Sequence, residues 1–170
     1  AVKDDIVFLT DCGTNRVLVF DLNKKEIVAI LHVGDQRIDI NHLNSLHVDD
    51  EFLYIGYNNR GNTPSEIYKL PLSVVPDNPQ SPVQIDFLGE SIQLAELQHT
   101  HDIEPFQDTF LVSASHKGRV FDVGSKTFLI QDEENYWVRG LALDGESLLR
   151  EIESPYQYLR IVEKPGELLL

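Results

Sequence analysis

The chain of 170 residues has no methionine and only one cysteine, Cys12. A single cysteine excludes an internal disulfide, so the fold cannot be a disulfide scaffold. No apolar run approaches the roughly 20 residues that a membrane-spanning helix needs, and no basic segment leads into an apolar one as in a signal peptide. A cytosolic setting is therefore the expectation, and a mature secreted chain would have the same composition.

Basic residues are also scarce. The chain has 14 Lys and Arg against 28 Asp and Glu, and its formal net charge is −14. Nucleic acid and anionic membranes would repel such a surface, so neither is expected as a partner. The acidic balance does not identify a positive partner. The simplest interpretation is a solvated acidic surface on a globular protein.

Sequence signatures of catalysis are missing as well. Gly56 and Gly61 are isolated rather than part of a phosphate-binding loop. Neither the G-x-S-x-G nor the H-E-x-x-H pattern occurs. The sequence therefore names no reaction, and it leaves open whether the protein is an enzyme.

What the chain does contain is one pattern that occurs three times, a strand, a polar turn and a second strand. The copies are 41–57, 99–115 and 137–153. Asn44 aligns with Arg139 without a gap, and Glu51 with Glu146. The middle copy fits with one extra residue, which places His101 on Asn44. A strand-turn-strand unit that returns at this spacing is typical of a β-propeller.

The similarity extends to a third strand, since 19–22 (VFDL) matches 120–123 (VFDV). The predicted fold is therefore all-β, a β-propeller of four-stranded antiparallel blades. The chain is predicted to be a single propeller domain or fragment, 1–170. The expected blades are approximately 5–33, 41–90, 99–134 and 136–170.

Two blades are expected to be incomplete. The chain opens in what reads as a second strand, 5–11, so the first blade is predicted to lack its innermost strand. Residues 146–154 (ESLLREIES) have helical propensity, but their place in the repeat predicts a strand. About three and a half blades result, whereas propellers close at roughly four to eight. The chain is therefore either a compact four-bladed ring or, as we expect, part of a larger ring completed by another chain or a further segment.

The starts of the innermost strands are the candidate functional site, because they crowd around the central channel of a propeller. His42, His99 and Trp137 fall on one repeat position, and Asn44, His101 and Arg139 on another. A strand repeats every two residues, so the two positions are expected to project to the same side. The predicted ligand-binding residues are His42, Asn44, His99, His101, Asp102 and Arg139.

Three interpretations of this cluster stay open. Histidines His42, His99 and His101 could hold a divalent metal such as zinc or iron, with Asp102 or Glu104 as a further carboxylate or as a hydrogen-bond partner of the ligands. A permanent guanidinium at Arg139 disfavours a cation and favours an anionic small molecule. The same polar residues could also form hydrogen bonds that hold neighbouring blades together.

The segments HLNSL (42–46), HTHDI (99–103) and WVRGLAL (137–143) resemble the blade signatures of a group of bacterial propeller proteins, in which H-L-N-G-L, H-D-I and R-G-L recur. The resemblance covers roughly residues 5–150. It implies a WD40/YWTD/NHL-like ring, six-bladed in type, and no established activity. The similarity ends at Leu149-Arg150, where such proteins continue with a glycine-rich strand. The positions to which it points are His42, Asn44, His99, His101, Asp102, Arg139 and Gly140.

These observations predict a propeller that binds an anionic small molecule or a protein. The first alternative is a metal-dependent lyase, hydrolase or oxygenase that uses the histidines around the channel. The second alternative is a structural repeat domain.

Overall fold

The computed structural model describes residues 1–32, 39, 41–75, 91–94, 97–115, 118–131, 137–144, 147–153 and 158–163. The chain divides into two compact units, Ala1–Gln93 and Leu94–Leu170. Across the described ranges the regular structure is β-strand with short 3-10 turns. No helix among these residues is long and apolar enough to cross a membrane. The all-β prediction is confirmed.

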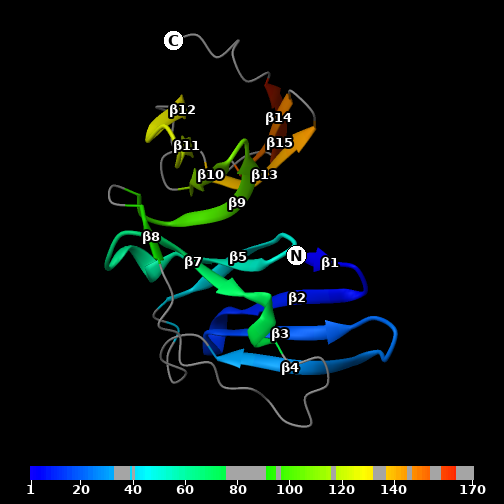
Figure 1. The fold of residues 1–170 in the computed structure, drawn as a ribbon. Coiled ribbons are helices and arrows are strands. Elements are labelled where there is room, and N and C mark those ends of the chain that lie inside the picture. The colour runs from blue at the N-terminus through cyan, green and yellow to red at the C-terminus, as the bar shows by residue number, and fades with distance from the viewer. Residues whose placement is uncertain are drawn as a thin grey trace. The chain divides into compact units, whose positions relative to one another are not determined.

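The first unit holds two four-stranded antiparallel sheets, here called blades 1 and 2 (Figure 1). Blade 1 consists of β1 (Val2–Lys3), β2 (Ile6–Asp11), β3 (Arg16–Asp21) and β4 (Glu26–His32), with the 3-10 turn η1 (Cys12–Thr14) after β2. Blade 2 consists of β5 (Leu43–Val48), β6 (Phe52–Tyr57), β7 (Glu66–Pro71) and β8 (Ser91–Gln93), with turns η2 (Asn59–Gly61) and η3 (Leu72–Val74) after β6 and β7. Each strand pairs with the next one along the chain, which is the meander of a propeller blade.

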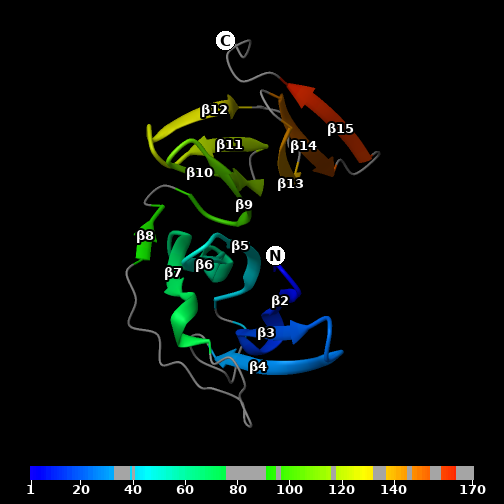
Figure 2. The same ribbon diagram turned by 45° about the vertical axis from the view of Figure 1, so that its right-hand side comes forward.

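The second unit repeats this design in blades 3 and 4 (Figure 2). Blade 3 consists of β9 (Thr100–Phe106), β10 (Thr109–Ala114), β11 (Arg119–Asp122) and β12 (Thr127–Gln131). Blade 4 has three described strands, β13 (Trp137–Asp144), β14 (Ser147–Glu153) and β15 (Tyr158–Glu163). The sequential meanders are those of propeller blades, as the repeat predicted.

Blades 1 and 4 were expected to be incomplete, and for blade 1 the expectation about its innermost strand is wrong. Blade 1 does have an innermost strand, since Val2 pairs with Val7 and Lys3 with Ile6. The sequence missed β1 because two residues are too few to show a pattern. In blade 4 the segment with helical propensity is β14, so strand pairing with β13 and β15 overrides local propensity as expected.

Strand pairing confirms the repeat alignment residue by residue. In blade 2 Ser45 pairs with Gly56, and the aligned Gly140 pairs with Glu151 in blade 4. In blade 3 Ile103 pairs with Val112, as Leu46 pairs with Ile55. The same alignment holds along both strands of blade 3, so the extra residue expected in the middle copy is not needed.

The match between 19–22 and 120–123 reflects a shared turn. The Asp21 carboxylate accepts hydrogen bonds from the N–H groups of Asn23 and Lys24. Asp122 accepts the corresponding bonds from Gly124 and Ser125. An aspartate that caps its own turn in this way fixes the hairpin between the third and fourth strands.

The core of each unit lies between its two blades. In the first unit one buried cluster joins both sheets, with side chains of alternate strand residues. Its fully buried members include Val17, Leu31, Leu43, Leu53 and Ile55. In the second unit a smaller cluster joins Leu111, Val120 and Ile130 to Val138 and Leu141. Stacking of the sheets is therefore the main source of buried apolar area.

Replacing Leu53 by alanine should destabilise the first unit by about 2–5 kcal/mol, because it leaves a cavity between two sheets. Leu53 has no exposed surface. Urea unfolding followed by circular dichroism measures the change. Leu22→Ala is the matched control, since Leu22 is 46% exposed in a turn. An equal effect of the two substitutions would contradict the placement of the core.

Candidate functional site

His42 and His99 stand directly before β5 and β9, the innermost strands of blades 2 and 3. Both have a left-handed backbone, with φ of 48° and 58°. This conformation is uncommon for residues with a Cβ atom, although histidine is among those that adopt it most often. His42 and His99, which the sequence placed on one repeat position, thus also share the same backbone conformation.

Asn44, His101 and Arg139 occupy β-bulges. Asn44 lies between the paired residues Leu43 and Ser45, and Arg139 between Val138 and Gly140. The register of β9 shifts at the corresponding place, around His101. A bulge inserts one residue and turns its side chain away from the regular alternation. The argument that a two-residue period puts His42 and Asn44 on one side therefore fails, because the strand is irregular between them.

In the first unit, His42 forms an ion-pair network that the sequence did not reveal. Its Nδ1 lies 2.9 Å from Oδ2 of Asp39, and the same oxygen accepts a hydrogen bond from Nη2 of Arg60. Burial pushes the pKa of Asp39 upward, but the hydrogen bonds from Arg60 and His42 outweigh it and hold that pKa below its ordinary value. Asp39 is therefore ionised at neutral pH.

An ionised Asp39 fixes the hydrogen-bonding state of His42. Because a carboxylate only accepts, Nδ1 of His42 carries the proton that it shares with Asp39. A neutral imidazole in this state accepts a hydrogen bond at Nε2, whereas an imidazolium donates one. Asp39 and Arg60 had no signal in the sequence, because neither lies on the repeat position that marked His42.

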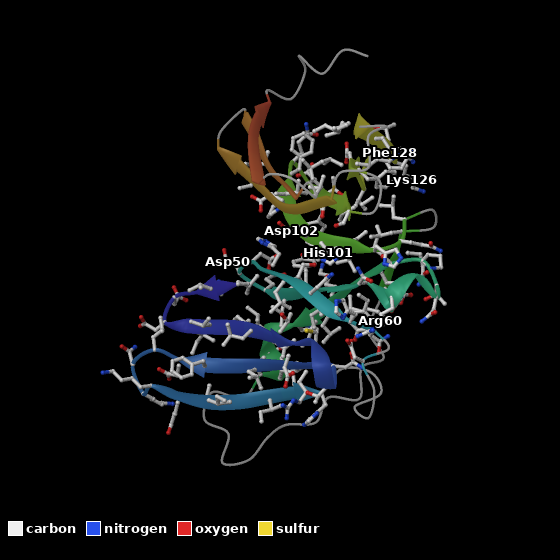
Figure 3. All side chains as sticks on the ribbon, turned by 180° about the vertical axis from the view of Figure 1, so that it is seen from behind. Asp50, Arg60, His101, Asp102, Lys126 and Phe128 are labelled. Carbon is white, nitrogen blue, oxygen red and sulfur yellow. The ribbon has the colours of Figure 1, made fainter. Side chains whose placement is uncertain are left out.

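In the second unit, Asp102 binds the backbone of the neighbouring blade. Its Oδ2 accepts from the N–H of Leu141 on β13 at 2.6 Å, and its Oδ1 from Ile103 at 3.0 Å. Figure 3 shows Asp102 beside His101 on β9. For the Asp102 carboxylate, the contact matches the third interpretation left open by the sequence, hydrogen bonds between blades.

Two further side chains of blade 3 bind β13 in the same way. Glu104 Oε1 accepts from the N–H of Leu143 at 3.3 Å, and Ser115 Oγ donates to the carbonyl of Val138 at 2.6 Å. These backbone groups lie on the edge of β13 that faces away from β14. Together with Asp102, the two side chains satisfy an edge that would otherwise lack partners.

The carboxylates at this edge are unusually basic. Burial raises the pKa of Asp102, and the hydrogen bonds from Leu141 and Ile103 offset only part of that rise. Burial also raises the pKa of Glu104, and the charge of Asp102 adds to the effect. The folded protein thus holds these protons more tightly than the unfolded chain. The free energy of unfolding should rise as the pH falls through the raised pKa values toward the ordinary value of about 4.

The predicted site residues fall in two units. His42 and Asn44 belong to the first unit, and His99, His101, Asp102 and Arg139 to the second. Their convergence around a common axis stays a prediction. Among the residues that the structure describes, no group of three His, Cys, Asp or Glu side chains is arranged to hold a metal ion.

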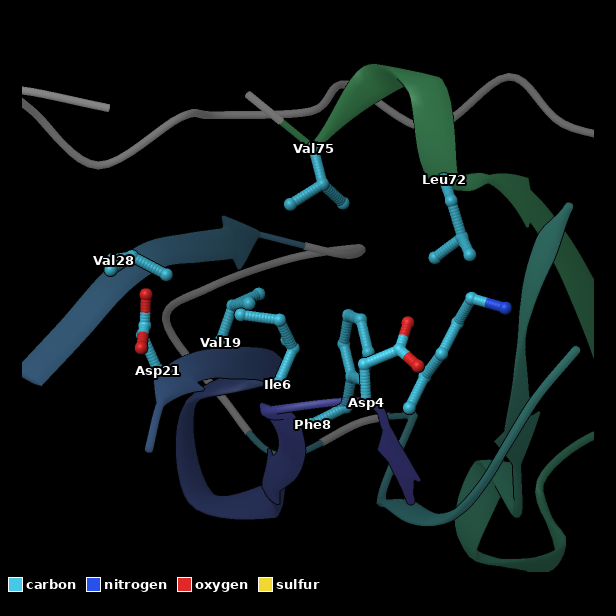
Figure 4. Close-up of a pocket in the computed structure, with 9 residues that line it drawn as sticks. Asp4, Ile6, Phe8, Val19, Asp21, Val28, Leu72 and Val75 are labelled. Atoms are coloured by element: carbon cyan, nitrogen blue, oxygen red, sulfur yellow. The ribbon is translucent and has the colours of Figure 1, made fainter. Parts of the chain in front are cut away.

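The first unit also contains a cavity of about 240 Å³ (Figure 4). It lies at the turn end of blade 1, near Asp4, whereas His42 stands at the opposite end of the strands. Its one basic side chain, Lys3, is 2.7 Å from Asp50 and is thus already neutralised. An anion would find little attraction there. The apolar lining is Ile6, Phe8, Val19, Val28, Leu72 and Val75.

Replacing Asp102 by alanine removes the acceptor for the Leu141 N–H and should cost about 1–3 kcal/mol of stability at neutral pH. The stability difference between wild type and Asp102→Ala should widen as the pH is lowered, because only the wild type gains stability from protonation of Asp102. Urea unfolding at several pH values measures it.

Asp108→Ala is the control for this substitution, since it removes an exposed carboxylate from the turn that follows β9. It should leave stability nearly unchanged at each pH. A difference that narrows on acidification would show that the ionised form of Asp102 is the stabilising one.

Comparisons with known proteins agree on the fold. No family model matches the chain, and no curated protein does. The computationally designed Ika4 protein aligns with a TM-score of 0.55 and 11% identity, over 97% of this chain and 88% of that one. Hydrazine synthase of Kuenenia stuttgartiensis aligns with a TM-score of 0.60 and 14% identity, over 96% of this chain and 44% of that one. BamB of Moraxella catarrhalis aligns with a TM-score of 0.46 and 16% identity, over 95% of this chain and 47% of that one.

Hydrazine synthase has a propeller-like fold. Identities this low show the fold alone, and the chain spans less than half of the hydrazine synthase chain. No match supports the finer YWTD/NHL-type signatures. The chain has the all-β fold of a partial β-propeller, with three four-stranded antiparallel blades and a fourth of which three strands are described.

Proposed function

We propose that this propeller binds a small anionic molecule at the starts of its innermost strands. The observation that supports the proposal is a repeated irregularity. Asn44, His101 and Arg139 each occupy the bulge of an innermost strand. His42 and His99 precede two of these strands in a left-handed conformation.

Irregular backbone at equivalent positions favours a binding role. Bulges are frequent beside functional sites, where they redirect a side chain. A left-handed backbone is easiest for glycine, so a histidine at such a position indicates that its side chain is useful there. Fold alone would not justify this step, because propellers serve many functions.

The residue types favour an anion. Imidazole and guanidinium groups donate hydrogen bonds to carboxylates and phosphates, and asparagine donates through its amide. Asp39 holds the imidazole of His42 in place through its Nδ1 atom. Asp102, placed by the sequence among the ligand-binding residues, acts in this proposal as a positioning residue that holds β13 against β9.

A titration with inorganic phosphate tests the proposal. We expect saturable binding to the wild type by isothermal titration calorimetry, and about tenfold weaker binding to His99→Gly, because one charge-assisted hydrogen bond is lost. Stability should stay within about 1 kcal/mol of wild type, since glycine adopts the left-handed backbone readily.

Gln107→Gly is the matched control. Gln107 is exposed, uncharged and has φ of 53°, so the same backbone change occurs away from the strand starts. It should bind phosphate as the wild type does. Failure of the wild type to bind phosphate, or equal loss in both variants, argues against an anion site. Stoichiometric zinc or iron in protein purified without an affinity tag would favour the metal-dependent enzyme instead.

A further inference from the structure

The cavity of the first unit, about 240 Å³ in volume, lies over the front face of blade 1, the face that carries Phe8 and Val19. These two side chains form its buried floor, since they are 3% and 1% exposed. Leu72, which begins the turn η3 of blade 2, and Val75, which follows that turn, lie on the opposite side (Figure 4). The cavity thus lies between the sheet of one blade and a turn of the next.

The space is too large and too apolar to be an ordinary packing defect. Protein interiors contain few voids larger than a water molecule. An engineered apolar cavity of about 150 Å³ stays dry and binds benzene, and this one is larger. Four of its apolar side chains pack against the core but are only partly buried, namely Ile6, Val28, Leu72 and Val75. An apolar guest would therefore remove from water a surface that the protein itself leaves accessible.

Two carboxylates stand beside this apolar lining. Asp4 belongs to the two-residue turn between β1 and β2 and has φ of 50°, and Asp21 ends β3. Figure 4 shows Asp4 beside Phe8 and Asp21 beside Val28. A guest whose apolar part contacts the lining would therefore place a polar group close to a carboxylate.

The balance of charge around the cavity is negative. Lys3 also lines it, but the Lys3 ammonium is 2.7 Å from Asp50. Asp21 is paired as well, at 3.5 Å from Lys24. Among the described residues, the lining and its ion-pair partners thus carry three carboxylates and two ammonium groups, and neither ion pair includes Asp4. Such a site favours a cation over an anion.

We propose that this cavity binds an organic amine, a small molecule with its apolar body against the lining and its ammonium group at the carboxylate of Asp4. The ammonium donates a charge-assisted hydrogen bond to the carboxylate. Asp4 is exposed, so solvent screens this contact and the apolar body supplies most of the affinity. The strand starts proposed to bind an anion lie at the other end of the strands, so the two proposals are independent.

Isothermal titration calorimetry with 2-phenylethylamine tests the proposal. We expect binding at one site with a Kd of about 1 mM. The uncharged analogue 2-phenylethanol has the same apolar body and should bind about threefold more weakly, because it lacks the ion pair. The anion 3-phenylpropionate should bind most weakly of the three. Absence of binding by the amine, or binding of either analogue as tight as that of the amine, would overturn the proposal.

The substitution Val75→Phe tests where the apolar body lies. The larger side chain fills part of the cavity, so the affinity for 2-phenylethylamine should fall about tenfold or more. Val74→Phe is the matched control, since Val74 belongs to the same turn, is 40% exposed and lies outside the described lining. This variant should bind the amine as the wild type does. Equal affinities of the two variants would contradict binding in the cavity.

The substitution Asp4→Asn tests the ammonium contact without changing the size of the cavity. Asparagine adopts the left-handed backbone of Asp4 as readily as aspartate does. The affinity for 2-phenylethylamine should fall about threefold, and that for 2-phenylethanol should not change. Asp5→Asn is the matched control, because Asp5 is the next residue of the same turn and lies outside the described lining. An equal loss in both variants would indicate general attraction to an acidic surface and would overturn the proposal.

Discussion

Apolar residues on both faces of each sheet are the constraint on which this structure depends. A four-stranded sheet with aliphatic side chains on only one face could leave its other face exposed to solvent. Blade 1 has Val19 on its front face and Leu18 on its back face, so both faces need a cover. Sheets of this kind gain most of their stability by stacking on neighbours, as in other repeat proteins. The inter-blade cores are therefore the source of cooperativity within each unit.

Stacking alone leaves the innermost strands with an open edge, and side-chain hydrogen bonds close it. On β13 this edge is satisfied by Asp102, Glu104 and Ser115 of blade 3. Buried carboxylates are costly acceptors, as their raised pKa values show. They are tolerated because unpaired backbone groups between two sheets would cost at least as much. The strand starts are thus held firmly, which is what a binding site on these strands requires.

The architecture could be predicted from the sequence because each copy of the repeat corresponds to one set of paired strands. Apolar alternation and polar turns recur in step with strand pairing, so aligning Asn44 with Arg139 amounted to aligning their pairing partners. What it missed has equally physical causes. A bulge is one inserted residue and leaves no mark in a period-two pattern. The contact between His42 and Asp39 depends on loop geometry, not on alternation.

The candidate site was predictable in position but not in detail. Repetition singled out the strand starts, because residues on the same repeat position share a backbone environment. It could not separate side chains that face a ligand from those that bind the next blade. Asp102 and His101 are neighbours on β9, yet the carboxylate bonds to β13. That distinction depends on how two sheets pack, which no pattern within one strand encodes.

Similar blades create a further problem, since any front face could in principle cover any back face. Apolar burial cannot choose between faces that are equally aliphatic. A charged residue at one level of the stack can, because it accepts only a partner of opposite sign and penalises the others. Asp11 does not make such a choice by itself, because its carboxylate is already paired with Arg16 on the next strand of the same blade. In a chain with a net charge of −14, each basic residue on a blade face is a scarce means of specifying a neighbour.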